Sequence, residues 1–183
     1  GYIYDKDGID TEKLKFIMEI KNIRRDRISE YKKKYPKSEF IIKGKPWEVP
    51  CDVAIPSATQ NELDGLDAKK LIDNGCICVA EGANMPCDSD AVKTFKENKI
   101  LFAPGKACNA GGVAVSGLEM AQNSLRYSWT RKEVDEKLKK IMIRIHEKCL
   151  EHGKEKDFID YGKGANISAF IKVADAMIAQ GVV

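Results

Sequence analysis

Polar side chains that could bind a ligand are concentrated in three short segments of this sequence, and each segment follows a run of apolar residues. Short amide side chains on turns can hydrogen-bond the amide and ribose groups of a dinucleotide. Asn61 and Asn84 have this character, although asparagine beside proline or glycine also commonly caps a helix or stabilises its own turn. The three segments are residues 56–63, 81–86 and 103–123.

The third segment is rich in glycine and runs into an amphipathic pattern, which is typical of a ligand-binding helix start. Lys106, Asn109 and Ser116 supply its polar groups. Ser116 follows the glycine pair by one helical turn, so its hydroxyl could donate to a substrate carboxylate. A serine among small residues can equally serve close helix packing. Nothing in the sequence links either histidine to Ser116, so we do not expect a nucleophile there.

The remaining residues with reactive side chains do not predict a metal centre. Two histidines, His146 and His152, are six residues apart and would lie on different faces of a helix. The cysteines match no paired metal-ligand spacing, and reduced thiols indicate an intracellular, cytoplasmic protein. The six cysteines are Cys51, Cys76, Cys78, Cys87, Cys108 and Cys149.

Composition and charge favour a globular protein with a small-molecule ligand. The chain has 183 residues, of which 43% are hydrophobic, and its formal net charge is +3. Such a small excess does not indicate a nucleic-acid partner, and the basic residues between 21 and 34 alternate with acidic ones, as on a solvated helix face. No apolar run is long enough to span a bilayer, so we expect no membrane partner.

Helices and strands must alternate to position the three polar segments. The pattern predicts a helix over 11–35, capped by Asp10 or Thr11 and less regular between residues 20 and 27. A later alternation of strands and helices indicates a parallel sheet covered by helices. In such a sheet the carboxyl ends of parallel strands face one crevice, so the polar segments could share one ligand. The predicted strands are 53–55, 76–80 and 100–102, and the predicted helices between them are 67–74 and 89–97.

Three further helices are predicted at residues 110–128, 131–152 and 165–180. Thr130 and Glu133 have the spacing of a capping box. The last helix carries an apolar stripe, which favours core packing over a ligand box. We therefore expect one domain over residues 1–183, with the terminal helices beginning near residue 110.

Several long segments resemble the carboxy-terminal part of an NADP-type glutamate dehydrogenase, of the Glu/Leu/Phe/Val dehydrogenase family. The resemblance covers essentially the whole chain and is more specific than a single glycine motif. It implies an α/β fold, in which an incomplete Rossmann-like coenzyme domain precedes carboxy-terminal helices. The matching segments are 58–64, 79–86, 102–107, 109–113, 116–123, 164–167, 173–177 and 180–183.

The resemblance also implies an activity, a cofactor and an assembly. The family deaminates L-glutamate to 2-oxoglutarate and ammonia with hydride transfer to NADP, with NAD possible, and its members are hexamers. It implies that Asn61 and Asn84 contact the nicotinamide ribose or carboxamide, with Ser57 and Asn109 nearby. It further implies that Val113 and Ser116 reach the substrate, with Ser116 hydrogen-bonded to the γ-carboxylate.

Parts of the family pattern are not found in this sequence. The glycine-rich dinucleotide turn, the residue that selects NAD or NADP, and the catalytic lysine and aspartate are all expected upstream of Gly1, together with the substrate domain. No catalytic residue is therefore expected in this chain. Because the proton-transfer groups would be missing, we expect the isolated chain to be inactive.

Two other functions remain open at the level of sequence. A branched-chain or aromatic amino-acid dehydrogenase would bind an apolar side chain, which would leave the Ser116 hydroxyl unpaired. A non-catalytic nucleotide-binding module would bind coenzyme tightly even without the upstream glycine turn.

Overall fold

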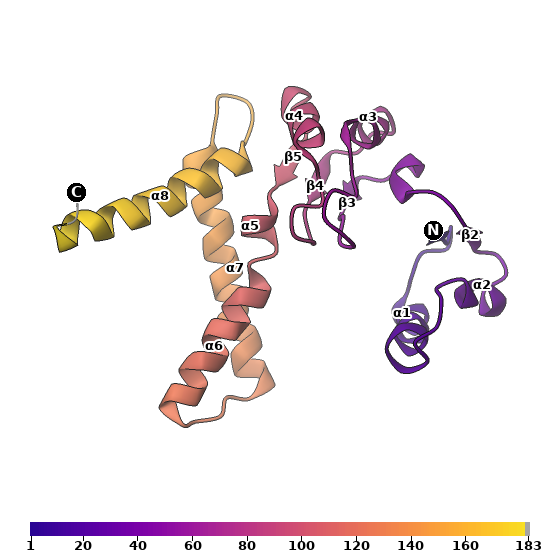
Figure 1. Cartoon of the computed structure of the whole chain (residues 1–183), viewed down its shortest axis with the longest axis horizontal. Coiled ribbons are helices and arrows are strands. Elements are labelled where there is room, and N and C mark those ends of the chain that lie inside the picture. The colour runs from indigo at the N-terminus through magenta and orange to yellow at the C-terminus, as the bar shows by residue number, and fades with distance from the viewer. Residues whose placement is uncertain (182–183) are drawn as a thin grey trace. The chain divides into compact units, whose positions relative to one another are not determined.

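The structure, a computed structural model, describes residues 1–181, which form two compact units (Figure 1). The first unit is Gly1–Glu48 and the second begins at Val49. The single domain predicted over 1–183 stays a prediction, because compact packing does not show whether the units fold independently. Val182 and Val183, at the end of the last matching segment, lie outside the described residues.

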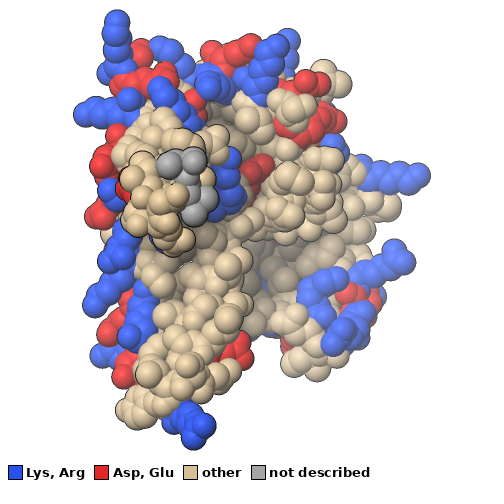
Figure 2. Space-filling model, turned by 60° about the vertical axis from the view of Figure 1, so that its left-hand side comes forward, with Lys and Arg blue, Asp and Glu red and all other residues tan. Residues whose placement is uncertain are grey.

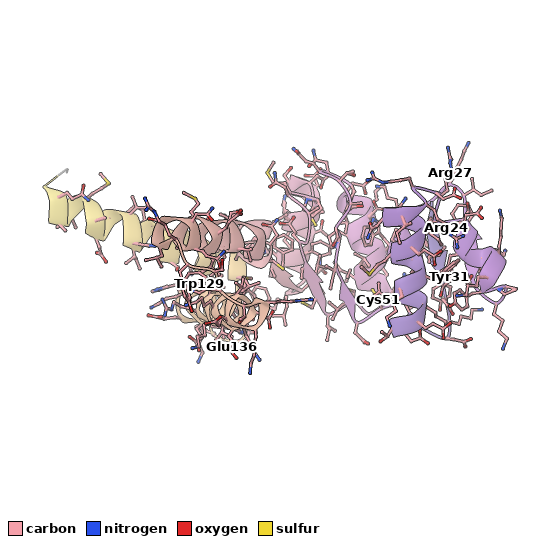
Figure 3. The ribbon with its side chains drawn as sticks, turned by 90° about the horizontal axis from the view of Figure 1, so that it is seen from below. Arg24, Arg27, Tyr31, Cys51, Trp129 and Glu136 are labelled. Carbon is pink, nitrogen blue, oxygen red and sulfur yellow. The ribbon has the colours of Figure 1, made fainter. Side chains whose placement is uncertain are left out.

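The first unit contains a small antiparallel sheet and short helices. Strand β1 (Tyr2–Tyr4) pairs with β2 (Glu39–Ile41), and a short 3-10 helix, η2 (Pro46–Glu48), ends the unit. Its core is formed by Phe16, Ile20 and Tyr31, of which Tyr31 is labelled in Figure 3. The Tyr31 hydroxyl donates a 2.7 Å hydrogen bond to Asp5. Burial, together with that bond, raises the pKa of the Tyr31 hydroxyl well above its usual range.

The helix predicted over residues 11–35 is interrupted, and the interruption falls around its less regular middle, residues 20–27. Helix α1 (Thr11–Met18) begins at the predicted cap, because the Asp10 side chain accepts a hydrogen bond from the Lys13 amide. It widens into a π-helical turn, η1 (Glu19–Ile23), and helix α2 (Glu30–Lys34) starts only after a break. Arg25 lies in that break with a φ of 56°, a left-handed conformation that a right-handed helix cannot include.

The second unit contains the predicted parallel sheet, in the order β3-β4-β5. The strands are β3 (Val53–Ala54), β4 (Cys78–Ala80) and β5 (Leu101–Ala103). Val53 faces Cys78 across the first pair, and Cys78 faces Leu101 across the second. All three strands fall within one or two residues of the predicted positions, so the α/β fold is confirmed.

Helices α3 (Gly65–Asp73) and α4 (Ser89–Glu97) connect the strands and pack against each other. Both begin at an aspartate whose side chain accepts backbone N–H groups that have no partner within the helix. Below them the core is apolar, and Phe95 of α4 stacks on Phe102 of β5 with ring centroids 5.9 Å apart. This contact packs α4 against β5 of the sheet.

Four helices complete the described chain: α5 (Gly105–Cys108), α6 (Gly111–Leu125), α7 (Arg131–Gly153) and α8 (Tyr161–Gln180). The predicted capping box of Thr130 and Glu133 is present at the start of α7. Trp129 precedes it and lies under the Lys137 ammonium, 4.5 Å from the ring centroid (Figure 3). Helix α8 crosses α7 so closely at Gly164 that an added Cβ would lie 2.1 Å from the Cys149 carbonyl oxygen.

The core packing predicted for the apolar stripe of the last helix is wrong for the residues that the structure describes. Phe170 is 71% exposed and Ile178 is 66% exposed. The reason is geometric: beyond its crossing with α7, helix α8 extends away from the rest of the second unit (Figure 1). The side chains around its end form a largely uncharged surface in Figure 2. Among residues 1–181, no helix combines the length and apolarity needed to cross a membrane.

Candidate functional site

Two of the predicted polar segments are tied together by backbone hydrogen bonds at the carboxyl ends of β3 and β4. The Asn61 amide donates to the Met85 carbonyl at 2.9 Å, and the Leu63 amide donates to the Pro86 carbonyl at 2.9 Å. Leu63 and Cys87 form an isolated parallel bridge beyond them. The loop after β3 and the loop after β4 therefore form one layer.

Two residues of this layer have left-handed backbone conformations. Asn61 has a φ of 53° and Met85 a φ of 47°. Asparagine tolerates this region well, whereas an unbranched apolar residue such as methionine adopts it less often. Such conformations persist where the surroundings impose them, and they are frequent at ligand sites. The strain at Met85 is thus consistent with a functional loop.

The buried carboxylate of Glu81 joins the loop after β4 to the start of α5. Glu81 is 6% exposed and follows β4 directly. One oxygen accepts the Gly105 amide at 2.6 Å and the other accepts the Cys87 amide at 3.2 Å. Burial, and then the nearby Glu81 carboxylate, raise the pKa of the Cys87 thiol far above its usual range. Glu81 therefore fixes the start of α5 against the loop after β4.

Asn109 also links the loop after β4 to α5. Its side-chain amide donates a 2.9 Å hydrogen bond to the Ala83 carbonyl. Its backbone amide, directly after α5, donates to the carbonyl of Gly105, the first residue of that helix. The role that the structure shows for Asn109 is therefore to position the loop that carries Asn84.

Ser57 lies where the first two loops approach most closely. Its hydroxyl donates to the Ile55 carbonyl at 3.0 Å. A Cβ added to Gly82 would lie 2.3 Å from that hydroxyl oxygen, so only glycine fits the observed approach.

Asn61, Asn84 and Asn109 line one cavity of about 1030 Å³. Its apolar wall includes Ile100 and Phe102. The side-chain amides of Asn61 and Asn84 make no hydrogen bond to any residue between 1 and 181, and both residues are exposed. The cavity therefore offers two unpaired amides beside an apolar surface, which suits a ligand with a flat apolar part and hydrogen-bonding groups.

Charged side chains from α4 and α8 line the opposite wall. Lys96 pairs with Asp160 at 2.7 Å. Burial raises the pKa of the Asp160 carboxyl, but hydrogen bonds from Lys96 and the Lys163 amide outweigh it, so the net shift is downward. Lys106 donates instead to the neutral Asn166 side chain. Among the described residues lining the cavity, Lys106 is a lysine with no carboxylate partner, which leaves its charge available to an anion.

Ser57, Val113 and Ser116 do not line this cavity. Val113 is 78% exposed on α6. The Ser116 hydroxyl donates to the Gly112 carbonyl of its own helix at 3.3 Å. The structure therefore brings together three of the six predicted site residues, and the ligand contacts of all six stay predictions.

Sequence reasoning did not single out several residues that the fold brings to the cavity. Glu81 was visible in the second polar segment, where an acidic residue directly after an apolar strand is unusual. The residues contributed by α8 and its cap carried no local signal of this placement, although Asn166 falls within the matching segment 164–167, because they lie far along the chain from the loops. They include Asp160, Lys163 and Asn166. Within residues 1–181 there is no group of three or more metal-binding side chains.

Comparison with known proteins places this arrangement in a family. The sequence profile of Glutamate/Leucine/Phenylalanine/Valine dehydrogenases matches residues 1–181. The chain belongs to this family. It is 60% identical over 184 residues to a glutamate dehydrogenase of Bacteroides thetaiotaomicron, and 57% identical over 183 residues to an NAD(P)-specific glutamate dehydrogenase of Xylanibacter ruminicola. Each alignment covers 100% of this chain and 41% of the relative.

Solved structures of the dehydrogenase family agree with the fold. The glutamate dehydrogenase of Plasmodium falciparum superimposes with a TM-score of 0.93 at 48% identity. That alignment covers 98% of this chain and 39% of the other. The parallel sheet and the loops at its carboxyl ends are therefore family features, and the chain spans less than half the length of the relatives that it matches.

Proposed function

We propose that the whole protein catalyses the reversible oxidative deamination of L-glutamate to 2-oxoglutarate and ammonia, with NADP or NAD as the hydride carrier. The observation that carries this proposal is the cavity where the amides of Asn61 and Asn84 converge beside Phe102. The identity of 57–60% to glutamate dehydrogenases supports the choice of substrate. No catalytic residue is assigned to this chain.

The residues present fit a nicotinamide coenzyme. When bound, the coenzyme would supply a ring that accepts or releases a hydride. Asn61 and Asn84 would orient it, because each amide offers both a donor and an acceptor to a carboxamide or a ribose hydroxyl. Glu81 and Asn109 also line the cavity, and their hydrogen bonds hold the loops in place around the coenzyme. The apolar Ile100 and Phe102 would exclude water from the ring.

The roles of Val113 and Ser116 toward the substrate remain part of the proposal. Both are exposed on α6 and are free to face a group outside residues 1–181. Replacing Ser116 by alanine in the whole protein is expected to raise KM for glutamate while leaving KM for the coenzyme unchanged. An unchanged KM for glutamate would remove Ser116 from the site.

A hexamer and a cytoplasmic location also belong to this proposal. The family resemblance supports the assembly, and six free cysteines are consistent with a reducing compartment. Light scattering of the purified whole protein tests the assembly, and a monomer would contradict it.

Replacing Asn84 by alanine in the whole protein tests the coenzyme site. Losing one or two hydrogen bonds of about 1 kcal/mol each predicts an increase of roughly tenfold in coenzyme Kd. Asn123→Ala is the matched control, because it removes the same amide from an exposed position on α6 outside the cavity. A coenzyme Kd for Asn84→Ala within twofold of the control would refute the assignment.

A further inference from the structure

Two cysteines lie side by side where β3 and β4 begin. Val53 faces Cys78 in the parallel register, so the same register two residues earlier places Cys51 opposite Cys76. Hydrogen bonds from the Ile77 and Cys78 amides to the Asp52 carbonyl, at 3.0 and 3.2 Å, continue the ladder to this point. The two cysteines therefore lie in neighbouring segments, each two residues before the start of an adjacent strand.

The spacing of these positions suits a disulfide bond. Neighbouring strands are about 4.8 Å apart, and the Cα atoms of disulfide-bonded cysteines are usually about 4.4–6.8 Å apart. Opposed residues of a parallel pair also project toward the same face of the sheet. The Cys76 thiol donates to the carbonyl of Cys78 at 3.2 Å and to the carbonyl of Asp52, the residue next to Cys51, at 3.7 Å. Little backbone movement is thus needed to join the two sulfur atoms.

The two thiols differ in access to solvent. Cys51 (labelled in Figure 3) is partly exposed, whereas Cys76 is 3% exposed. A dissolved reagent can therefore reach Cys51, and Cys76 can then react with the modified Cys51 from within the protein. This combination of an accessible thiol and a buried neighbour is the arrangement that thiol-disulfide exchange requires.

We propose that Cys51 and Cys76 form a reversible disulfide bond on exposure to a small-molecule disulfide such as oxidised glutathione. The Cys51 thiolate attacks one glutathione sulfur, forming a mixed disulfide and releasing one glutathione thiolate. The Cys76 thiolate then attacks the Cys51 sulfur and releases the second glutathione. The two cysteines lose two electrons and two protons, and both are taken up as one oxidised glutathione becomes two reduced ones.

The other cysteines have different surroundings. Cys78, Cys108 and Cys149 line a separate apolar cavity of about 310 Å³. Cys87 is buried beside Glu81. Burial raises the pKa of the Cys51 thiol, so the exchange is expected to accelerate as the pH rises from neutral. The bond would form at the opposite ends of the strands from the candidate coenzyme site, so it does not depend on the proposed function.

Peptide mapping of the purified protein tests this proposal. The reduced protein is incubated with oxidised glutathione at pH 8, its free thiols are blocked with N-ethylmaleimide, and it is digested with trypsin. We expect a peptide containing Cys51 joined to the peptide 71–93, with the loss of two hydrogens, and release of both after dithiothreitol treatment. Tandem fragmentation must place the link on Cys76, because Cys78 and Cys87 share that peptide.

Substitutions separate this pair from its neighbours. The link is expected to disappear in Cys51→Ser and in Cys76→Ser and to persist in Cys78→Ser, the matched control. Oxidation is also expected to raise the thermal midpoint of the unsubstituted protein by several degrees, because the bond closes a long loop, and to leave the midpoint of Cys51→Ser unchanged. Blocking of both thiols by N-ethylmaleimide, a stable glutathione adduct on Cys51, or a link through Cys78 would each overturn the proposal.

Discussion

Replacing Glu81 by glutamine tests how the candidate site is held together. The Glu81 carboxylate is almost fully buried and accepts the Gly105 and Cys87 amides. Glutamine has nearly the same shape but only one acceptor oxygen. One of the two backbone amides must therefore lose its partner and face the new NH₂ group, which cannot accept a hydrogen bond.

The size of the effect follows from the loss of one hydrogen bond to a charged acceptor. Such a bond contributes about 1.5–3 kcal/mol, and a buried amide left without a partner costs a similar amount. Taking about 2 kcal/mol, the local opening equilibrium around Gly105 should increase by roughly 30-fold, since each 1.36 kcal/mol is a factor of ten.

Amide hydrogen exchange at neutral pH measures this equilibrium directly. The exchange rate of the Gly105 or Cys87 amide is expected to rise by roughly 30-fold in Glu81→Gln where exchange is limited by local opening. Glu62→Gln is the matched control. Its carboxylate also accepts a backbone amide, from Ala58 at 2.8 Å, but that bond is exposed to water. The control should change exchange at Gly105 and Cys87 less than threefold.

A rise of less than threefold at both Gly105 and Cys87 in Glu81→Gln would refute the reasoning. It would mean that packing alone fixes the start of α5 against the loop after β4, and that the buried carboxylate is not needed to position the site.

Three further predictions concern other parts of the chain. Gly164→Ala should lower the free energy of unfolding by about 1–3 kcal/mol in urea, because the new Cβ would meet the Cys149 backbone where α8 crosses α7. In the control Gly117→Ala on α6, the new Cβ meets no atom within 4 Å, so the free energy of unfolding should not fall. Hydrogen bonds from Tyr31 and Lys13 lower the pKa of the Asp5 carboxyl below 3.8. The stability that they give the first unit is therefore complete above that pH and is lost as the pH falls through the depressed pKa. Near-ultraviolet circular dichroism should show that this acid transition is weaker in Asp5→Asn. The isolated 183-residue chain should produce no reduced coenzyme from glutamate and NADP, and measurable turnover would show that it holds its own proton-transfer groups.

Local sequence patterns predicted most of the second unit correctly. The strands around Val79 and Phe102 and the threonine cap of α7 are determined by neighbours in the sequence, so they could be predicted without the fold. The aspartates that cap α3 and α4 were not predicted. The helix over 11–35 was predicted with a less regular middle, but the pattern did not reveal that the left-handed residue Arg25 interrupts it there. The burial predicted for the last helix was wrong, because an apolar stripe indicates that a helix face favours burial but does not identify the element that packs against it.

The sequence by itself determined the alternating elements, the family resemblance and the polar segments after each strand. Parallel strands bring those segments to one edge, so Asn61, Asn84 and Asn109 could be expected together. Only the tertiary structure decided that Ser116 lies outside the cavity, that Glu81 joins the loop after β4 to α5, and that residues of α8 line the cavity. The Glu81–Gly105 hydrogen bond and the contribution of α8 bring together residues far apart in the chain, and local propensities carry no information about such long-range contacts.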